Sequence, residues 1–172
     1  MGSVAGEDEF DGFVRGHAPR LIRSAWLLVG DWPAAEDLVQ IALERTWPKW
    51  TKLADDGQRL AYVHRVITTS YLRARRRKWL GEIPTDDIPA RLVSDESDAA
   101  EVHAELIGAI RKLPPRQRAV VALRYLADLT EAQTAAAMRC SLGTVKRYTS
   151  RALETLRADA RLGDLFAEEN TQ

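Results

Sequence analysis

The sequence predicts an all-α protein made of two small helical domains that an acidic linker joins. Apolar residues recur at helical spacing along most of the 172 residues, and the pattern breaks over residues 81–98, where two prolines and repeated acids occur. Residues 129–157 divide into two short helices with a tight turn between them, which is the helix-turn-helix layout. A chain of this length buries one good core or two small ones, and the break favours two.

The N-terminal part is expected to form two helices. An apolar stripe runs from Phe10 to Val29; Pro19 is expected to kink or split this helix, and Gly30 to end it. Asp31 then serves as the N-cap of a second helix, which Trp47-Pro48 stops. The outward face of this second helix is mostly acidic and polar, and it carries Glu36, Asp37, Gln40, Glu44 and Arg45.

A third helix is predicted from about Gln58 to Trp79, after a loop over residues 50–57. Its inward stripe consists of Leu60, Val63, Ile67, Tyr71 and Ala74. Seven Lys or Arg and no acid lie between Arg59 and Trp79. The last turn, RRRK, suits either nucleic-acid phosphates or a solvated helix end that complements the helix dipole, and both alternatives stay open.

Charge is segregated along the chain although the formal net charge is +0. Residues 82–105 hold eight Asp or Glu against Arg91 alone, and residues 111–124 add five basic residues without an acid. Local basic patches neutralise phosphates, so the balanced net charge does not exclude a nucleic-acid binder.

After the linker, one helix is predicted from about Ala99 to Leu113 and another over residues 117–127, with two prolines between them. These helices supply hydrophobic support for the helix-turn-helix. Thr130 begins the first helix of that motif with a capping box, and Ser141 caps the second. The second helix carries donors suited to phosphates and to guanine edges, namely Thr144, Lys146, Arg147, Ser150 and Arg151.

Other function classes find little support in the sequence. No apolar run approaches the roughly 20 residues that span a bilayer, and the acidic start is unlike a signal peptide, so we expect a cytoplasmic protein. The single cysteine, Cys140, excludes an internal disulfide and a Cys-rich zinc site, and it fits a structural place in the motif's turn. His17, His64 and His103 match no zinc-ligand spacing. No phosphate loop or nucleophile motif occurs, so we expect no enzyme activity, no cofactor and no metal.

Three segments in this order resemble extracytoplasmic-function sigma factors of RNA polymerase, and most closely the compact actinobacterial SigE-like group. They are AEDLVQ at 35–40, RARRRK at 73–78 and LPPRQRAVVALRYLADLTEAQTAAAMRCSLGTVKRYTSRAL at 113–153. The resemblance implies sigma domain 2 over residues 8–80, the linker over 81–98, sigma domain 4 over 99–161 and a short tail over 162–172.

The resemblance also implies the partners of a promoter-specificity subunit. These are core RNA polymerase, through the clamp helices of its largest subunit and its flap, and promoter DNA in double- and single-stranded form. An anti-sigma factor is a further candidate, whereas no membrane and no small-molecule substrate is expected. The polymerase is expected to meet Glu36, Asp37, Leu38 and Gln40. For Leu38, packing in the core is the favoured alternative.

The DNA-binding residues follow from the same resemblance. The proximal promoter element is expected to meet Trp50, Lys52, Tyr62, Arg65, Thr69, Arg73, Arg75, Arg76 and Arg77. Among these, an exposed Trp50 or Tyr62 would stack on an unpaired base. The distal element is expected to meet Arg116, Arg118, Leu142, Gly143, Thr144, Lys146, Arg147, Tyr148, Ser150 and Arg151. For Thr144, a role in the helix cap is an equal alternative.

Several positions depart from the pattern of the sigma factors. Arg139 stands where the turn commonly has Gly, so a left-handed backbone there would be less comfortable. Thr134 and Thr149 replace aliphatic residues, and we hypothesise that both hydroxyls bond to carbonyls one turn back. The linker either threads through the polymerase as a mimic of nucleic acid or is a solvated spacer. Two other functions stay open: a stand-alone helix-turn-helix regulator and a helical protein-interaction adaptor.

Overall fold

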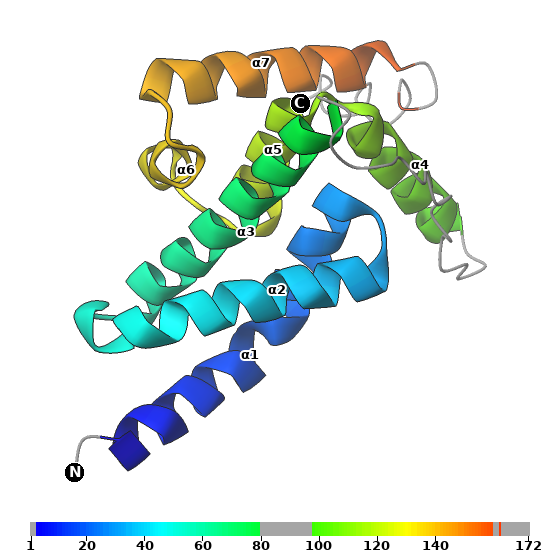
Figure 1. The fold of residues 1–172 in the computed structure, drawn as a ribbon. Coiled ribbons are helices and arrows are strands. Elements are labelled where there is room, and N and C mark those ends of the chain that lie inside the picture. The colour runs from blue at the N-terminus through cyan, green and yellow to red at the C-terminus, as the bar shows by residue number, and fades with distance from the viewer. Residues whose placement is uncertain (1–2, 80–97, 160–161, 163–172) are drawn as a thin grey trace, which may run out of the picture.

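The computed structural model describes residues 3–79, 98–159 and 162. These residues form seven α-helices and two shorter helical segments, and no strand occurs among them (Figure 1). The prediction of an all-α fold is therefore confirmed. The expected linker and tail lie almost wholly outside the described residues.

The N-terminal half contains three long helices: α1 (Ser3–Val29), α2 (Trp32–Thr46) and α3 (Asp56–Trp79), with a 3₁₀ segment, η1 (Trp47–Lys52), before α3. The predicted caps are present. Gly30 ends α1 with a φ of 84°, and the Asp31 carboxylate accepts a hydrogen bond from the Ala34 amide at 2.9 Å. Pro19 lies inside α1, which is one continuous helix. Of the kink or split expected at Pro19, the split was therefore a wrong prediction. Fully buried residues just beyond Pro19, such as Leu21, hold the helix in the core and offset the lost hydrogen bond.

The C-terminal half contains α4 (Asp98–Lys112), α5 (Pro115–Val121), α6 (Glu131–Met138) and α7 (Leu142–Ala158). The helix predicted over 117–127 begins as α5 and continues as a π-helical segment, η2 (Ala122–Leu126). Tyr125 and Leu126, at the end of this segment, are exposed.

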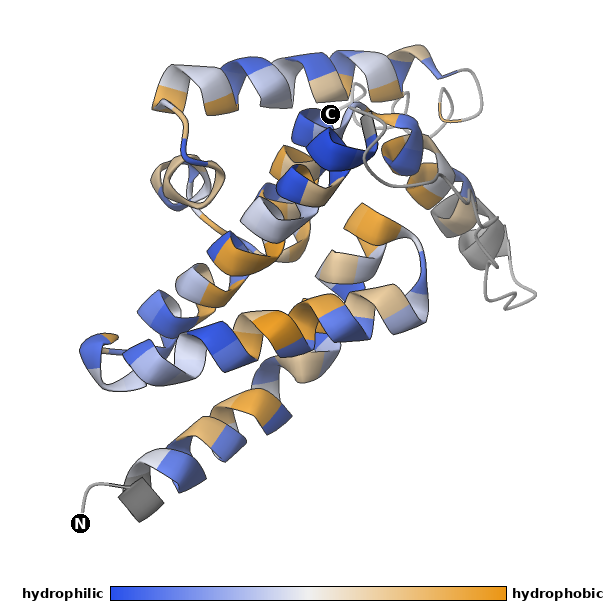
Figure 2. Cartoon of the chain, viewed as in Figure 1, coloured by the Kyte–Doolittle hydropathy of each residue, from blue (hydrophilic) through white to orange (hydrophobic). Residues whose placement is uncertain are grey.

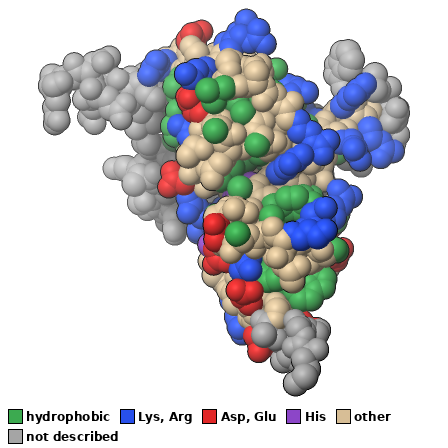
Figure 3. Space-filling model, turned by 90° about the vertical axis from the view of Figure 1, so that its left-hand side faces the viewer, with side chains coloured by type: hydrophobic (Ala, Val, Ile, Leu, Met, Phe, Trp, Pro, Cys, Tyr) green, Lys and Arg blue, Asp and Glu red, His purple; other side chains and the backbone are tan. Residues whose placement is uncertain are grey.

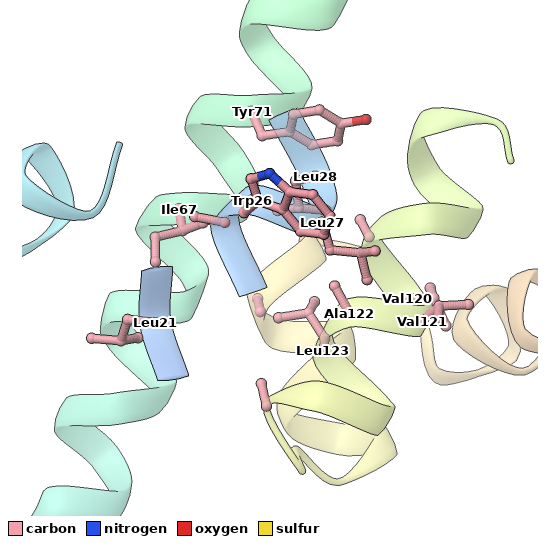
Figure 4. Close-up of a cluster of buried hydrophobic side chains, with 14 of the residues drawn as sticks. Leu21, Trp26, Leu27, Leu28, Ile67, Tyr71, Val120, Val121, Ala122 and Leu123 are labelled. Atoms are coloured by element: carbon pink, nitrogen blue, oxygen red, sulfur yellow. The ribbon is translucent and has the colours of Figure 1, made fainter. Parts of the chain in front are cut away.

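One hydrophobic cluster joins the two halves. Leu21 and Leu28 of α1, Ile67 of α3, Val120 of α5 and Leu123 of η2 belong to the same group of buried side chains (Figure 4). Figure 2 shows the hydrophobic residues of α1 and α2 grouped along their shared side, while α7 carries many hydrophilic residues. In Figure 1, α3 runs diagonally through the molecule and α6 lies beside it, in agreement with their close packing.

Candidate nucleic-acid interface

The helix-turn-helix is built by local hydrogen bonds that the sequence predicted. At the start of α6, the Gln133 amide donates to the Thr130 hydroxyl at 3.1 Å and the Thr130 amide donates to the Gln133 side chain at 2.8 Å, so the capping box is complete. The Thr144 amide donates to the Ser141 hydroxyl at 3.1 Å and caps α7. Between the helices, Arg139 adopts the left-handed conformation with φ 52° and ψ 49°. Arginine therefore occupies the left-handed turn that glycine fills most comfortably.

One side of α7 is anchored in the core and the other is a row of exposed donors. Val145, Ala152 and Leu156 are buried. The predicted contacts that remain exposed on α7 are Leu142, Gly143, Lys146, Arg147, Ser150 and Arg151. We call Lys146, Arg147 and Arg151 the α7 basic row. It is held loosely, since the Lys146 ammonium meets the Glu131 carboxylate of α6 only at 3.8 Å, between partly exposed side chains.

Two other α7 residues that were predicted to contact DNA, Thr144 and Tyr148, make contacts within the protein. The Thr144 hydroxyl lies 2.8 Å from the Ser141 hydroxyl, so it takes part in the cap, as the alternative interpretation stated. Tyr148 is half-buried and packs against the hydrophobic cluster, with the Arg147 guanidinium 5.8 Å from its ring centroid. Contact with DNA at these two positions stays a prediction.

The threonines that replace aliphatic residues differ from each other. The Thr149 hydroxyl donates to the Val145 carbonyl at 2.9 Å, which confirms the hypothesis for this residue. Thr134 is fully buried and its hydroxyl has no hydrogen-bond partner among the described residues, so the hypothesis was wrong there. Burial without a partner costs free energy, so Thr134 is a weak point of this core.

Arg118 is not a surface residue. It was expected to contact phosphates, but it is only 8% exposed and donates hydrogen bonds to backbone carbonyls at the ends of two helices. Its neighbour Arg116 is exposed, and contact with phosphates stays a prediction there. A pattern of basic residues in the sequence cannot show which of two nearby arginines, Arg116 or Arg118, is buried.

Trp50 is also buried, which corrects the expectation of an exposed stacking ring. It is 2% exposed, with Phe10 and Phe13 of α1 packed edge-on at centroid distances of 4.9 Å and 5.2 Å. The Arg59 guanidinium lies 3.9 Å from the Trp50 ring centroid. The Glu9 carboxylate accepts hydrogen bonds from the Arg59 guanidinium at 3.1 Å and from the Trp50 indole at 3.2 Å, and these bonds lower the pKa of Glu9. Trp50 therefore fixes η1 against α1.

The face of α3 divides into an exposed part and a half-buried part. The exposed predicted contacts near and along it are Lys52, Arg73, Arg75, Arg76 and Arg77. Tyr62 and Arg65 are half-buried and line a hollow of about 430 Å³ together with α6 residues. The Thr69 hydroxyl donates to the Arg65 carbonyl at 2.8 Å. Figure 3 shows Lys and Arg side chains spread over the upper and middle parts of one face of the molecule.

Deeper in α3, His64 is 1% exposed. Burial, with added repulsion from Arg20 and His17 of α1, lowers the pKa of His64 to about 4. Among the residues that the structure describes, no group of three or more His, Cys, Asp or Glu side chains is placed to hold a metal ion.

The face of α2 that is predicted to meet the polymerase is open. Glu36, Asp37 and Gln40 are exposed, while Leu38 is half-buried and packs against the hydrophobic cluster. Beside this face, α1 and α2 enclose a hollow of about 520 Å³ lined by Glu7, Phe10, Asp11, Val14, Gln40, Leu43, Glu44 and Trp47. No described helix is long and apolar enough to cross a membrane.

Comparisons with known proteins agree with this geometry. The sigma-70 region 2 family matches residues 13–80, which contain α2 and α3, and the sigma-70 region 4 family matches residues 103–156, which contain the helix-turn-helix. The RNA polymerase sigma-E factor of Streptomyces coelicolor is 39% identical over 170 residues, which cover 97% of this chain and 93% of that protein. The sigma-E factor of Streptomyces avermitilis is 38% identical over 159 residues, with 92% and 89% covered.

A solved structure shares the fold. The sigma factor RpoE of Bartonella quintana, in complex with the anti-sigma factor NepR, superimposes with a TM-score of 0.64 at 23% identity, and the match covers 87% of this chain and 94% of that one.

Proposed function

The chain belongs to the sigma-70 family of RNA polymerase sigma factors, and we propose a division of labour among its helices in directing core polymerase to promoters. In this proposal, residues 8–80 bind polymerase and the proximal promoter element, and residues 99–161 bind the distal element. The protein has no active site of its own and acts in the cytoplasm, where polymerase works.

The observation that carries the proposal is the α7 basic row on a helix whose other face is locked in the core. The N-terminal end of α7, around Leu142 and Gly143, is exposed and enters the major groove first. Lys146, Arg147 and Arg151 then bind phosphates or guanine edges. Arg116 adds a phosphate contact from α5.

The proximal element meets α3. The exposed arginines of its last two turns, Arg73, Arg75, Arg76 and Arg77, bind the strand's phosphates. Tyr62 takes the stacking role that Trp50 is too deeply buried to fill, and Arg65 lies beside it on the same hollow.

The acidic and polar face of α2 is the proposed polymerase surface. Glu36, Asp37 and Gln40 point away from the core, and together they complement basic side chains on a partner. Substituting Asp37→Lys reverses charge at the centre of this surface without touching the core. The exposed Asp8→Lys on α1 is a charge-matched control, since Asp8 lies outside the proposed polymerase face and does not line the hollow beside it.

Transcription from a matched promoter with purified core polymerase tests the function. The wild-type protein is expected to support specific initiation, and Asp37→Lys to lose it at limiting protein while still binding DNA. A stand-alone regulator would bind its DNA without polymerase and would not support initiation. An adaptor would not bind DNA at all, and either result would reject the proposed function.

A further inference from the structure

The turn that leads into α3 lines the surface that is proposed to take the unpaired DNA strand. Residues of this turn and of the first turn of α3 border the hollow of about 430 Å³, namely Leu53, Asp55, Gly57 and Gln58. Tyr62 and Arg65, further along α3, border the same hollow. We call residues 53–58 the entry turn. Its position relative to α3 sets the shape of the site that a base stacked on Tyr62 would enter.

The path of the entry turn is fixed by a capping box of its own. The Gln58 amide donates to the Asp55 carboxylate at 2.8 Å, and the Ala54 amide donates to the Gln58 side-chain oxygen at 3.3 Å. These bonds join residues of the turn to one another. They do not fix where the turn lies relative to the rest of the protein, so its position depends on contacts with another helix.

Helix α1 supplies those contacts through one carboxylate oxygen. Glu9 Oε2 accepts a hydrogen bond from the Trp50 indole at 3.2 Å and another from the Arg59 guanidinium at 3.1 Å. Trp50 precedes the entry turn and Arg59 follows it, so this oxygen is bonded to residues on both sides of the turn. The Arg59 guanidinium also lies 3.9 Å from the Trp50 ring centroid, which joins the two sides directly.

Arg59 depends on its acidic partners because it is buried. It is 8% exposed, and a buried cation costs free energy unless it is paired. Its partners are Glu9 on α1 and Asp56 in the entry turn, each at 3.1 Å. Without Glu9, Arg59 keeps only the partner that moves with the turn. The bond to Glu9 is therefore the ionic contact that ties Arg59 and the entry turn to α1.

From these contacts we propose that Glu9 is a positioning residue for the proximal promoter element: through Trp50 and Arg59 it holds the entry turn in the place where the unpaired strand reaches Tyr62. The inference rests on the proposed function of the α3 surface. Glu9 does not line the hollow, and its carboxylate repels phosphates. Electrostatics alone therefore predicts that removal of Glu9 strengthens strand binding, whereas the positioning role predicts that its removal weakens binding.

Truncation of Glu9 tests this sign. Glu9→Ala removes both hydrogen bonds, whereas Glu9→Gln keeps the length and one acceptor oxygen but makes weaker bonds to a cation. Asp8→Ala removes the same charge from an exposed neighbouring position and is the control. Fluorescence anisotropy of a labelled single strand that carries the proximal element, titrated with holoenzyme, measures the affinity.

Glu9→Ala is expected to bind the strand about tenfold more weakly than wild type, as when the turn is correctly placed in about 10% of molecules. Glu9→Gln is expected to recover part of this loss and to bind about threefold more weakly than wild type. Asp8→Ala is expected to bind as tightly as wild type or slightly more tightly, because it only removes a negative charge.

Two further measurements separate positioning from a general loss of structure. Affinity for distal-element duplex and the melting temperature of the free protein are expected to stay at the wild-type values in Glu9→Ala. A fluorescent base analogue, placed at each position of the strand in turn, reports stacking at saturating holoenzyme. In Glu9→Ala the analogue is expected to be less stacked at the position that Tyr62 meets.

The outcomes distinguish this inference from the proposed function. Wild-type or tighter strand binding by folded Glu9→Ala would overturn the positioning role, and so would equal losses of affinity at the proximal and distal elements. If Glu9→Ala does not fold, Glu9→Gln decides, and a wild-type affinity for the strand would overturn the role. Failure of wild-type holoenzyme to bind the strand would instead reject the proposed function of the α3 surface, and this inference with it.

Discussion

The two DNA-facing helices, α3 and α7, present their basic residues in different ways. The α7 basic row is exposed, and the caps that fix α7 lie within the helix-turn-helix itself. On α3, the last turns are open, but Tyr62 and Arg65 are half-buried under α6, and His64 and Thr68 are buried. Local hydrogen bonds and the helical period determine which residues of α7 are exposed. On α3, packing against distant segments determines which residues are exposed.

The largest change in stability is expected on substitution of Trp50. This substitution tests whether the aromatic side chain packs in the core or stacks on DNA. Trp50→Ala empties a site that is 2% exposed and removes the ring that Arg59 and two phenylalanines contact. The free energy of unfolding is expected to fall by about 3–5 kcal/mol. Chemical denaturation measures the loss.

Tyr62→Ala is the matched control for Trp50. Tyr62 is half-buried beside the open hollow, so its truncation is expected to weaken binding of a single strand by about 1–3 kcal/mol and to change stability less than Trp50→Ala. The opposite pattern, with Trp50→Ala stable and deficient in strand binding, would show that the ring leaves the core to meet DNA.

The buried part of α3 is also expected to make stability depend on pH. His64 is neutral in the folded protein because burial lowers its pKa to about 4, while the unfolded chain keeps a value near 6.5. Between these values the unfolded state binds one more proton than the native state. Stability is therefore complete above about pH 6.5 and falls towards pH 4, by on the order of 3 kcal/mol in total.

Unfolding by urea across this pH range, on wild type and His64→Gln, measures the contribution of His64. The glutamine variant is expected to lose the part of the slope that His64 causes, although other groups still titrate. An unchanged slope would mean that His64 is hydrated or charged in the folded protein.

The contrast between the helices also explains what the sequence could predict. Ser141, Thr130 with Gln133, and Gly30 act within a few residues of themselves, so their caps and turns follow from spacing alone. The same is true of the inward face of α7. Most of the fold, and the exposure of most α7 residues that were predicted to meet the distal element, therefore follow from the sequence.

The errors fall where long-range contacts decide. Nothing near Arg118 in the sequence indicates that Leu28, 90 residues away, accepts its hydrogen bond. Trp50 lies in a polar stretch, and only its contacts with Phe10, Phe13 and Glu9 of α1 bury it. Periodicity reports which face of a helix is apolar, but not which polar residues a distant helix covers.

On α7, neutralising the basic row is expected to act on DNA binding and not on the fold. The variant Lys146→Ala, Arg147→Ala, Arg151→Ala removes three exposed charges. Affinity for distal-element duplex is expected to drop roughly a hundredfold, at about 1 kcal/mol per charge. Where all three contact phosphates, the slope of log affinity against log salt becomes shallower by about 2.7.

Electrophoretic mobility shifts with holoenzyme at several salt concentrations measure both quantities. Arg139→Ala alters the nearby turn rather than the basic row and serves as a control for folding, through its melting temperature. A triple variant with unchanged affinity and salt slope would show that the row is merely solvated, and the difference between α3 and α7 would lose its functional meaning.

The smallest effect separates the two threonines of the helix-turn-helix. Thr134→Val replaces a fully buried hydroxyl that has no partner by a methyl group of similar volume, so the free energy of unfolding is expected to rise by about 1 kcal/mol. Thr149→Val removes a partly buried hydroxyl that donates to the Val145 carbonyl one turn back. Here the expected change is less than about 0.5 kcal/mol. Urea denaturation of both single variants resolves the difference. Equal changes in the free energy of unfolding would mean that the Thr134 hydroxyl is as well hydrated or hydrogen-bonded as the Thr149 hydroxyl.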